Sequence, residues 1–276
     1  SGVDGCVIAS ATTAHAEQLE TVMRAGVPAF CEKPVARDLA GAVALAGLER
    51  ETGVPVQVGF QRRFDVGYRR VRDAVTSGEL GTVHLVRAIT HDQAPPPAAY
   101  LPVSGGIFRD CSIHDLDVVR FVTGQEAVTV SAAGGNKGDR SFVDADDVDT
   151  AAAILTMADG TLALLSATRY NGAGHDVRLE VTGSRGAMAV GLDQSLALDS
   201  AEPGVTLTHG PRHWSFLERF RPAYAAELEA FVASIGGAPS PCTARDGLEA
   251  QRLAEACDLS RRRGAPVRLE EILDAR

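Results

Sequence analysis

Short apolar segments alternate with amphipathic stretches along the first sixty residues. The pattern predicts strands at 6–9, 28–31 and 54–59 and helices at 14–25, 38–52 and 65–77. Gly26 and Gly53 are placed to end the first two helices, and Asp38 is placed to cap the second. Strands and helices that alternate at this spacing are typical of parallel βαβ units, in which helices cover a sheet.

After residue 82 the pattern changes, and strand-like runs follow one another with turns between them. They predict strands at 82–91, 148–157, 161–169, 177–182, 187–192 and 195–199 and helices at 111–123, 223–235 and 244–263. Asp159-Gly160 is typical of a hairpin turn, and Thr243 with Asp246 resembles a capping box. We therefore predict an α/β fold, in which a partial Rossmann-type parallel sheet (1–62) precedes an α+β domain (63–276) with a large, mostly antiparallel open sheet.

Composition and charge argue against several classes of function. The 276 residues carry a formal net charge of −9, whereas binding to nucleic acid needs clustered Lys and Arg. No apolar run approaches the roughly 18 residues that cross a membrane. The five cysteines are widely spaced and include no C-x-x-C pair. We therefore expect no disulfide framework and no zinc site, and we infer a cytoplasmic location.

The segment Glu32-Lys33-Pro34 is the first candidate for chemistry. It follows a predicted parallel strand, and ligands of open α/β sheets bind beyond the carboxyl ends of the strands. Pro34 restricts Lys33 to an extended backbone and permits a cis peptide bond. The alternative interpretation is a surface lysine at the end of a strand.

The second candidate runs from Asp110 to Asp117. On one helix, Asp110 and His114 share a face because they are four residues apart. A carboxylate beside an imidazole raises its basicity and fixes its tautomer, as general acid–base catalysis requires. The alternative is a helix N-terminus that favours acidic residues, with His114 only packed. We expect Asp115 and Asp117 to be solvated; the alternative for Asp115 is that it orients a neighbouring group.

Other polar residues give weaker signals. The acidic stretch 144–149 lacks the glycine and the distal glutamate of an EF-hand loop, so we interpret it as an exposed strand entrance and expect no metal site. His91 ends one predicted strand and His175 begins another, so both are placed to line a pocket; the alternative is an ordinary surface position. No Gly-x-Ser-x-Gly motif and no Cys/His pairing supports nucleophilic acyl transfer.

Four motifs in order make the chain resemble the Gfo/Idh/MocA oxidoreductases, and among them the inositol 2-dehydrogenase-like members. Residues 9–15 resemble the family's A-T-P-x-x-x-H segment, and residues 32–34 match its E-K-P motif. Residues 59–65 are close to G-F-x-R-R-F-D, and residues 110–115 match D-x-x-x-H-D. Each motif is weak by itself, but four at familial spacing are a strong signal.

The resemblance implies a Rossmann domain followed by a substrate-binding domain that often builds homodimers or homotetramers. It implies NAD or NADP as hydride acceptor, with NAD favoured, and a cyclic polyol or sugar as substrate. The catalytic residues it implies are Lys33, Asp110 and His114. The residues it places beside the cofactor are Ser10, Ala11, Thr12, His15, Glu32, Lys33, Pro34 and Gln61. Those it places beside the polyol are His91, Gln93 and His175.

The start of the chain departs from the family pattern. The family begins with a strand, a G-x-G-x-x-G loop, a helix and a second strand, which bind the adenosine and pyrophosphate of the cofactor. The sequence contains no such loop, so we expect about sixty further residues upstream and weak dinucleotide binding without them. Two alternatives stay open: a truncated, non-catalytic relative that binds sugars or serves as an oligomer partner, and a keto-sugar reductase.

Overall fold

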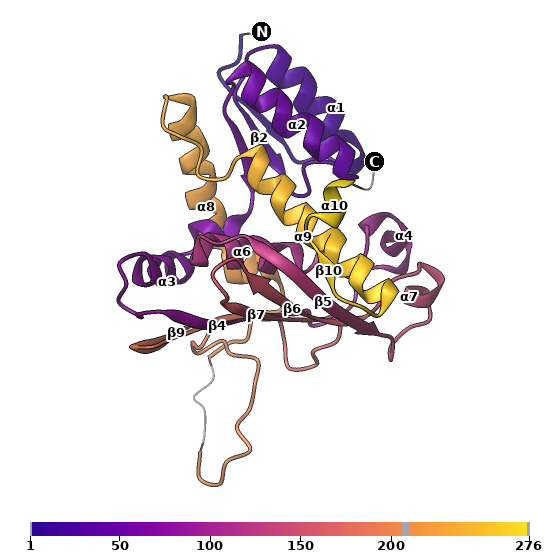
Figure 1. The fold of residues 1–276 in the computed structure, drawn as a ribbon, viewed down its shortest axis with the longest axis vertical. Helices are drawn as coiled ribbons and strands as arrows, with labels where there is room; N and C mark the ends of the chain where they lie inside the picture. The colour runs from indigo at the N-terminus through magenta and orange to yellow at the C-terminus, as the bar shows by residue number, and fades with distance from the viewer. Residues whose placement is uncertain (1, 206–209, 275–276) are drawn as a thin grey trace. The chain divides into compact units, whose positions relative to one another are not determined.

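The computed structural model describes residues 2–205 and 210–274 and divides into two compact units (Figure 1). The first unit contains Ser1–Asp65 and Pro222–Arg252, and the second contains Val66–Arg221 and Leu253–Arg276. The segment 222–252, which the sequence placed in the second domain, therefore packs with the first unit.

A three-stranded parallel sheet forms the centre of the first unit, in the order β1-β2-β3. Its elements are β1 (Cys6–Ile8), α1 (Thr12–Arg24), β2 (Ala29–Glu32), α2 (Leu39–Thr52), β3 (Val56–Gly59) and the 3-10 helix η1 (Gln61–Phe64). Cys6 pairs with Ala29, which pairs with Val56, so the carboxyl ends of the strands lie along one edge of the sheet. The predicted parallel βαβ arrangement is confirmed.

Helix α2 has the predicted ends. The Asp38 carboxylate accepts a hydrogen bond from the Gly41 amide at 2.8 Å, and Gly53 ends the helix with a φ of 66°. The segment 222–252 packs on the sheet of this unit: the Phe231 ring centroid lies 6.0 Å from that of Phe30 on β2. At the edge of β3, the Val58 amide donates to the Cys242 carbonyl at 2.8 Å, so this strand edge is paired.

Glu49, near the end of α2, links three parts of the first unit. Its carboxylate accepts hydrogen bonds from the Val56 amide of β3 at 3.3 Å and from the Ala244 amide at 3.0 Å. Burial raises the pKa of Glu49 to about 7, although the two backbone donors lower it. Because the pKa is higher in the folded than in the unfolded chain, the folded protein loses stability as pH rises from the unfolded value of 4.5 towards 7.

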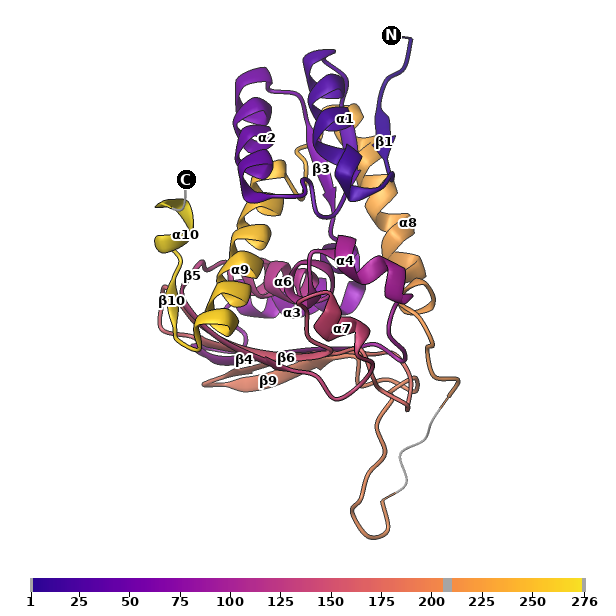
Figure 2. The ribbon, with the colours of Figure 1, turned by 90° about the vertical axis from the view of Figure 1, so that its right-hand side faces the viewer.

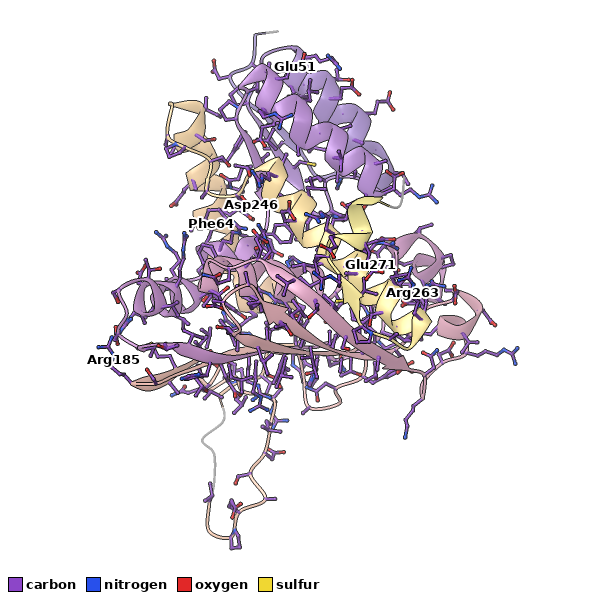
Figure 3. The ribbon with its side chains drawn as sticks, in the orientation of Figure 1. Glu51, Phe64, Arg185, Asp246, Arg263 and Glu271 are labelled. Carbon is purple, nitrogen blue, oxygen red and sulfur yellow. The ribbon has the colours of Figure 1, made fainter. Side chains whose placement is uncertain are left out.

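We expect the unfolding free energy of the wild type to fall by roughly 2–3 kcal/mol relative to Glu49→Gln between about pH 5 and about pH 8. The glutamine cannot ionise and lacks this pH dependence. Urea unfolding at the two pH values measures the difference. Glu51→Gln is the matched control, because Glu51 is exposed on the same helix (Figure 3). A wild-type-to-Glu49→Gln difference that is the same at both pH values would contradict the expectation.

The second unit contains a seven-stranded sheet in the order β10-β5-β6-β7-β4-β8-β9. Its strands are β4 (Val83–His91), β5 (Ala127–Gly135), β6 (Thr150–Met157), β7 (Leu162–Thr168), β8 (Asp176–Gly183), β9 (Gly186–Val190) and β10 (Val267–Arg268). All neighbours are antiparallel except β4 and β7, so the predicted mostly antiparallel sheet is confirmed.

Two strands of this sheet were not predicted, and one predicted strand does not form. Strand β5 is rich in Ala, Gly and Ser, which give a weak strand pattern. Strand β10 has two residues. The segment 195–199 is not a strand, although three of its residues in a row are apolar. A turn leads into it, in which the Leu196 amide bonds to the Asp193 carbonyl, and no neighbouring strand pairs with it among the described residues.

Helices cover one face of the seven-stranded sheet, as α3 and α6 do in Figure 2. The remaining helices are α3 (Val66–Thr76), η2 (Ala98–Tyr100), α4 (Leu101–Ser104), α5 (Ile107–Asp110), α6 (Ile113–Thr123), α7 (Ser141–Asp144), α8 (Phe216–Ile235), α9 (Ala244–Arg263) and α10 (Glu271–Asp274). Alternate residues of β6, from Ala151 to Met157, are buried, as expected for a sheet with one covered face. Within the described ranges, no helix combines the length and hydropathy needed to span a membrane.

Helices α8 and α9 each contribute residues to both units. Helix α8 begins before Pro222 rather than after it, and the Phe220 ring in this early part is buried 6.4 Å from the Tyr68 ring. Helix α9 has the predicted capping box, since the Thr243 amide donates to the Asp246 carboxylate at 2.9 Å and the Asp246 amide donates to the Thr243 hydroxyl at 3.3 Å.

The last turn of α9 is basic. It contains Arg261, Arg262 and Arg263, whose positive charges interact favourably with the negative end of the helix dipole. Arg263 also forms an ion pair with Glu271 of α10 at 2.9 Å, and the two labelled side chains lie close together in Figure 3.

Candidate active site

The residues predicted to contact a cofactor gather at the carboxyl edge of the three-stranded sheet. Loops that follow the three parallel strands carry them, and this is the edge at which α/β sheets bind ligands. After β1 they are Ser10, Ala11 and Thr12; at the end of β2 they are Glu32, Lys33 and Pro34; after β3 it is Gln61.

His15 joins two of these loops. Its side chain is buried, with Nδ1 at 2.8 Å from the Pro34 carbonyl oxygen and Nε2 at 3.0 Å from the Ser10 carbonyl oxygen. The Lys33–Pro34 peptide bond is cis, as the sequence permitted. His15 therefore fixes the loops that carry Ser10 and Lys33, and a contact between its own ring and a cofactor stays a prediction.

Two polar groups lie at this edge, of which Gln61 is buried and Glu32 is half-buried. Burial raises the pKa of Glu32, although the neighbouring charges of Lys33 and His15 oppose this shift. The Gln61 side chain is 2% exposed, and its Oε1 has no hydrogen-bond partner among the described residues. The carboxamide of a nicotinamide carries N–H donors that match such an acceptor. The residues at this edge therefore fit the nicotinamide half of NAD or NADP.

In the second unit, three strands meet at one level of the sheet. His91, the last residue of β4, pairs with Thr168, the last residue of the parallel strand β7, and with Asp176, the first residue of β8. The residues one step beyond this level must therefore lie close together. They are Asp92, Arg169 and His175.

These three residues form a hydrogen-bonded group with Asp110 and Tyr100, which we call the Arg169 cluster. Arg169 donates from Nη1 to Asp92 at 2.7 Å and from Nη2 to Asp110 at 2.6 Å. The Tyr100 hydroxyl donates to the other oxygen of Asp110 at 3.0 Å, and His175 Nδ1 lies 3.4 Å from Asp92. The Arg169 side chain is 6% exposed, so one buried cation serves two carboxylates.

Charge and burial set the protonation states within the cluster. Burial alone would raise the pKa of Asp92, but its hydrogen bond with His175 and the Arg169 cation lower it. Burial and the Asp110 carboxylate raise the pKa of Tyr100 to about 12, so Tyr100 stays protonated at neutral pH and donates a hydrogen bond to Asp110. Burial opposes the charge of Arg169, yet the two carboxylates hold its pKa above the ordinary value.

Two buried nitrogens of the cluster have no hydrogen-bond partner among the described residues. They are Arg169 Nε and His175 Nε2. Buried polar atoms in proteins are nearly always paired, with protein, water or ligand. Both nitrogens are therefore suited to contact a water molecule or a polar ligand.

Asp110 and His114 do not share one helix, and the prediction that they do was wrong. Asp110 ends α5 and His114 lies in α6, which begins at Ile113. Between these helices the Ser112 amide bonds to the Ile107 carbonyl, five residues back rather than four. This wider turn removes the regular i, i+4 spacing on which the prediction depended. His114 is half-buried.

Four aspartates predicted to be solvated or exposed are buried. Asp115 accepts two contacts from the Thr90 hydroxyl, at 2.8 and 3.0 Å, and Asp117 is also buried. Asp147 accepts from the Ile107 amide at 3.0 Å, and Asp149 accepts from two amides of the 137–138 turn. These carboxylates satisfy buried donors of the fold. Across the part of the chain that the structure describes, no group of three or more His, Cys, Asp or Glu could hold a metal ion.

The structure does not bring His91 into the Arg169 cluster. Its Nε2 lies 3.1 Å from the Ser166 hydroxyl, and strand alternation puts its side chain on the face opposite Thr90. Burial lowers the pKa of His91 and favours the neutral ring. Gln93 follows Asp92 and is half-buried. The polyol contacts of His91 and Gln93 stay predictions.

Sequence reasoning missed Asp92, Arg169 and Tyr100. Arg169 was placed at the end of a predicted strand, and Asp92 directly after another. Charged residues at the ends of two strands would have indicated a site if the strands had been known to be parallel neighbours. The pairing of β4 with β7 links residues far apart in the chain, and the local pattern does not contain it.

Comparisons with known proteins agree with this architecture. The family model described as "Oxidoreductase family, NAD-binding Rossmann fold" matches residues 1–60, and the GFO/IDH/MocA C-terminal domain matches residues 68–189. The myo-inositol dehydrogenase Hyg17 of Streptomyces leeuwenhoekii is 40% identical over 267 residues, which cover 96% of this chain and 80% of that protein. The chain belongs to the Gfo/Idh/MocA family. It is thus a member of a family of NAD(P)-dependent oxidoreductases that act on CH–OH groups.

Other members of the family are similar over nearly the whole chain. Inositol 2-dehydrogenase of Rhizobium meliloti is 39% identical over 255 residues, covering 92% of this chain and 77% of that protein. The crystal structure of scyllo-inositol dehydrogenase from Lactobacillus casei, with bound NAD(H) and scyllo-inositol, is 30% identical with a TM-score of 0.86 and covers 98% of this chain and 81% of that one. The chain is therefore related to inositol dehydrogenases.

Proposed function

We propose that the protein is a dehydrogenase that oxidises a secondary hydroxyl of an inositol-like cyclic polyol, with NAD as the preferred cofactor. The main support is the environment of Asp110, whose carboxylate accepts hydrogen bonds from Arg169 and Tyr100. The relatives described above as inositol dehydrogenases support the substrate class, and the NAD(H)-bound relative supports the cofactor.

Three side chains divide the chemistry in this proposal. When bound, NAD would supply the hydride acceptor for the carbon that carries the reacting hydroxyl. His114 removes the proton from that hydroxyl as general base, and Asp110 stabilises the imidazolium that results. Lys33 donates a hydrogen bond to the same oxygen and stabilises the charge that develops on it. The proton thus leaves with His114 and the electron pair with the hydride, so the alcohol becomes a ketone.

The remaining candidates bind rather than react. We propose that Gln61 bonds to the nicotinamide carboxamide, because its buried oxygen has no partner among the described residues. Ser10, Ala11, Thr12, Glu32 and Pro34 line the cofactor edge, and His15 keeps their loops together. His175 offers Nε2 to a polyol hydroxyl, and Gln93 and His91 are further polyol contacts.

A substrate screen tests this function. The protein is incubated with NAD or NADP and with myo-, scyllo- and chiro-inositol, pentoses or hexoses, and reduced cofactor is followed by absorbance. We expect turnover with at least one inositol and a higher kcat/KM with NAD than with NADP. Faster reduction of a keto-sugar by NADH would favour the reductase assignment. Cofactor binding without turnover of any polyol would contradict the dehydrogenase assignment.

We also propose that the protein assembles as a homodimer or homotetramer in the cytoplasm. The uncovered face of the seven-stranded sheet carries exposed apolar side chains, such as Ile154 and Leu162, which are 47% and 43% exposed. The five cysteines are free, which suits a reducing compartment. Light scattering in solution tests the assembly, and a monomer at micromolar concentration would contradict it.

A further inference from the structure

We propose that Arg169 is a positioning residue of the active site, which holds Asp110 ionised and in one orientation and connects it to His175 through Asp92. This inference deepens the proposed function and rests on it, because it assigns a task to a residue that touches the candidate catalytic aspartate.

The shape of the guanidinium group supports this role. Arg169 uses one terminal nitrogen for Asp92 and the other for Asp110, at 2.7 and 2.6 Å. The group is planar and rigid, so two such bonds fix the direction of each carboxylate. A lysine ammonium has no such fork.

The backbone around Arg169 is fixed as well. Arg169 directly follows β7, and its amide bonds to the Asp149 carbonyl at 2.8 Å. Asp92 follows the parallel neighbour β4, and its amide bonds to the Thr168 carbonyl at 2.8 Å. The cation and its first partner are therefore placed by sheet pairing and not by loop conformation, which gives the precision that a site requires.

Electrostatics supply the second argument. Asp92 and Asp110 each contribute a negative charge and share one cation, whose side chain is 6% exposed. Without Arg169, the pair would share a proton, because two carboxylates in one site cannot both ionise easily. The titratable groups that interact with Arg169 are Asp92, Asp110, Tyr100, Cys111 and Asp147, and His175 faces Asp92.

The same chain of contacts orients His175. Its Nδ1 faces the Asp92 carboxylate, which Arg169 holds, so Nε2 is the nitrogen left for a ligand. Arg169 thus connects the candidate catalytic aspartate with a candidate polyol contact. Removal of Arg169 should therefore disturb both Asp110 and His175, whereas removal of Asp92 should mainly disturb His175.

Kinetics of four variants test the proposal. We expect Arg169→Met to lower kcat by about 10- to 100-fold and to move the acid limb of the pH–rate profile to higher pH, with unchanged binding of NAD. Arg169→Lys should restore part of kcat and move the acid limb back. Asp92→Asn should raise KM for the polyol more than it lowers kcat. Arg120→Met is the matched control: Arg120 is 9% exposed at its side chain and pairs with Glu126, so its loss should leave kcat and the pH profile unchanged.

A purely structural role predicts a different result. Arg169→Met would then lower only the melting temperature, while kcat and the acid limb stayed at the wild-type values, and this would overturn the proposal. Carboxyl carbon chemical shifts during a pH titration provide a readout without catalysis. In Arg169→Met, the chemical shift of one aspartate carboxyl carbon should change with pH at a higher pH than that of any aspartate in the wild type. If the wild type turns over no polyol, the proposed function fails, while this titration still supports or overturns the role of Arg169.

Discussion

Replacement of His114 by alanine is expected to lower kcat with the polyol by about 10²–10⁴-fold, while the affinity for NAD stays unchanged. The general base contributes only when the hydroxyl proton moves, so its loss affects the reaction and not the binding of cofactor. Steady-state kinetics and calorimetric titration with NAD measure the two effects separately. His84→Ala is the matched control, because His84 is an exposed histidine on β4.

The pH dependence adds a second check on His114. With the base removed, hydroxide from the solvent must take the proton, so the residual rate of His114→Ala should keep rising with pH, where the wild type levels off. Turnover of His114→Ala at the wild-type rate would remove His114 from the mechanism. A loss of NAD affinity equal to the loss of rate would point to misfolding or to a binding role.

Replacement of Lys33 by methionine is expected to lower kcat by about 10²–10³-fold, the usual effect of removing one donor to a developing oxyanion. Methionine keeps most of the length and the apolar stem of lysine and removes the charge. The chain contains two lysines, Lys33 and Lys137, so Lys137→Met is the matched control at an exposed position. Steady-state kinetics with an inositol and NAD measure the change.

A rise in KM for the polyol with an unchanged kcat would contradict the role given to Lys33, because it would show equal binding of substrate and transition state. Circular dichroism of Lys33→Met checks that the substitution has not disturbed the fold.

Local signals in the sequence were sufficient for much of the fold. Asp38 and Gly53 define the ends of α2 through interactions within a few residues, and Thr243 with Asp246 does the same for the start of α9. The Asp159-Gly160 hairpin and the parallel βαβ units also follow from short-range chemistry. Such features are encoded locally, and they form as predicted.

Features that depend on contacts between distant segments were missed. The parallel pairing of β4 and β7 brings Asp92 and Arg169 together although 77 residues separate them. A wide turn at Ser112 places Asp110 and His114 on different helices. It depends on a backbone hydrogen bond that no residue type in the sequence predicts. Asp115 was expected in solvent because acidic residues usually lie there, but the Thr90 hydroxyl pairs with it in the core.

Candidate residues could be named from motifs, but their surroundings could not. Lys33, Asp110 and His114 follow from the resemblance to the family, whereas the donors that hold Asp110 come from β7 and from the turn at Tyr100. Spacing in the sequence shows which residues are close along the chain. The electrostatic field at a carboxylate depends instead on which charged groups are close in space.

Transfer of a labelled hydride tests the central claim most directly. The protein is incubated with NAD and an inositol that carries deuterium at every ring carbon. The reduced cofactor is then isolated, and its deuterium content is measured by mass spectrometry. The account predicts NADH with one deuterium at nicotinamide C4 and a slower rate than with the unlabelled inositol. In His114→Ala, formation of this labelled NADH should slow by about 10²–10⁴-fold. NADH without deuterium, or no reduced cofactor with any inositol, would contradict it.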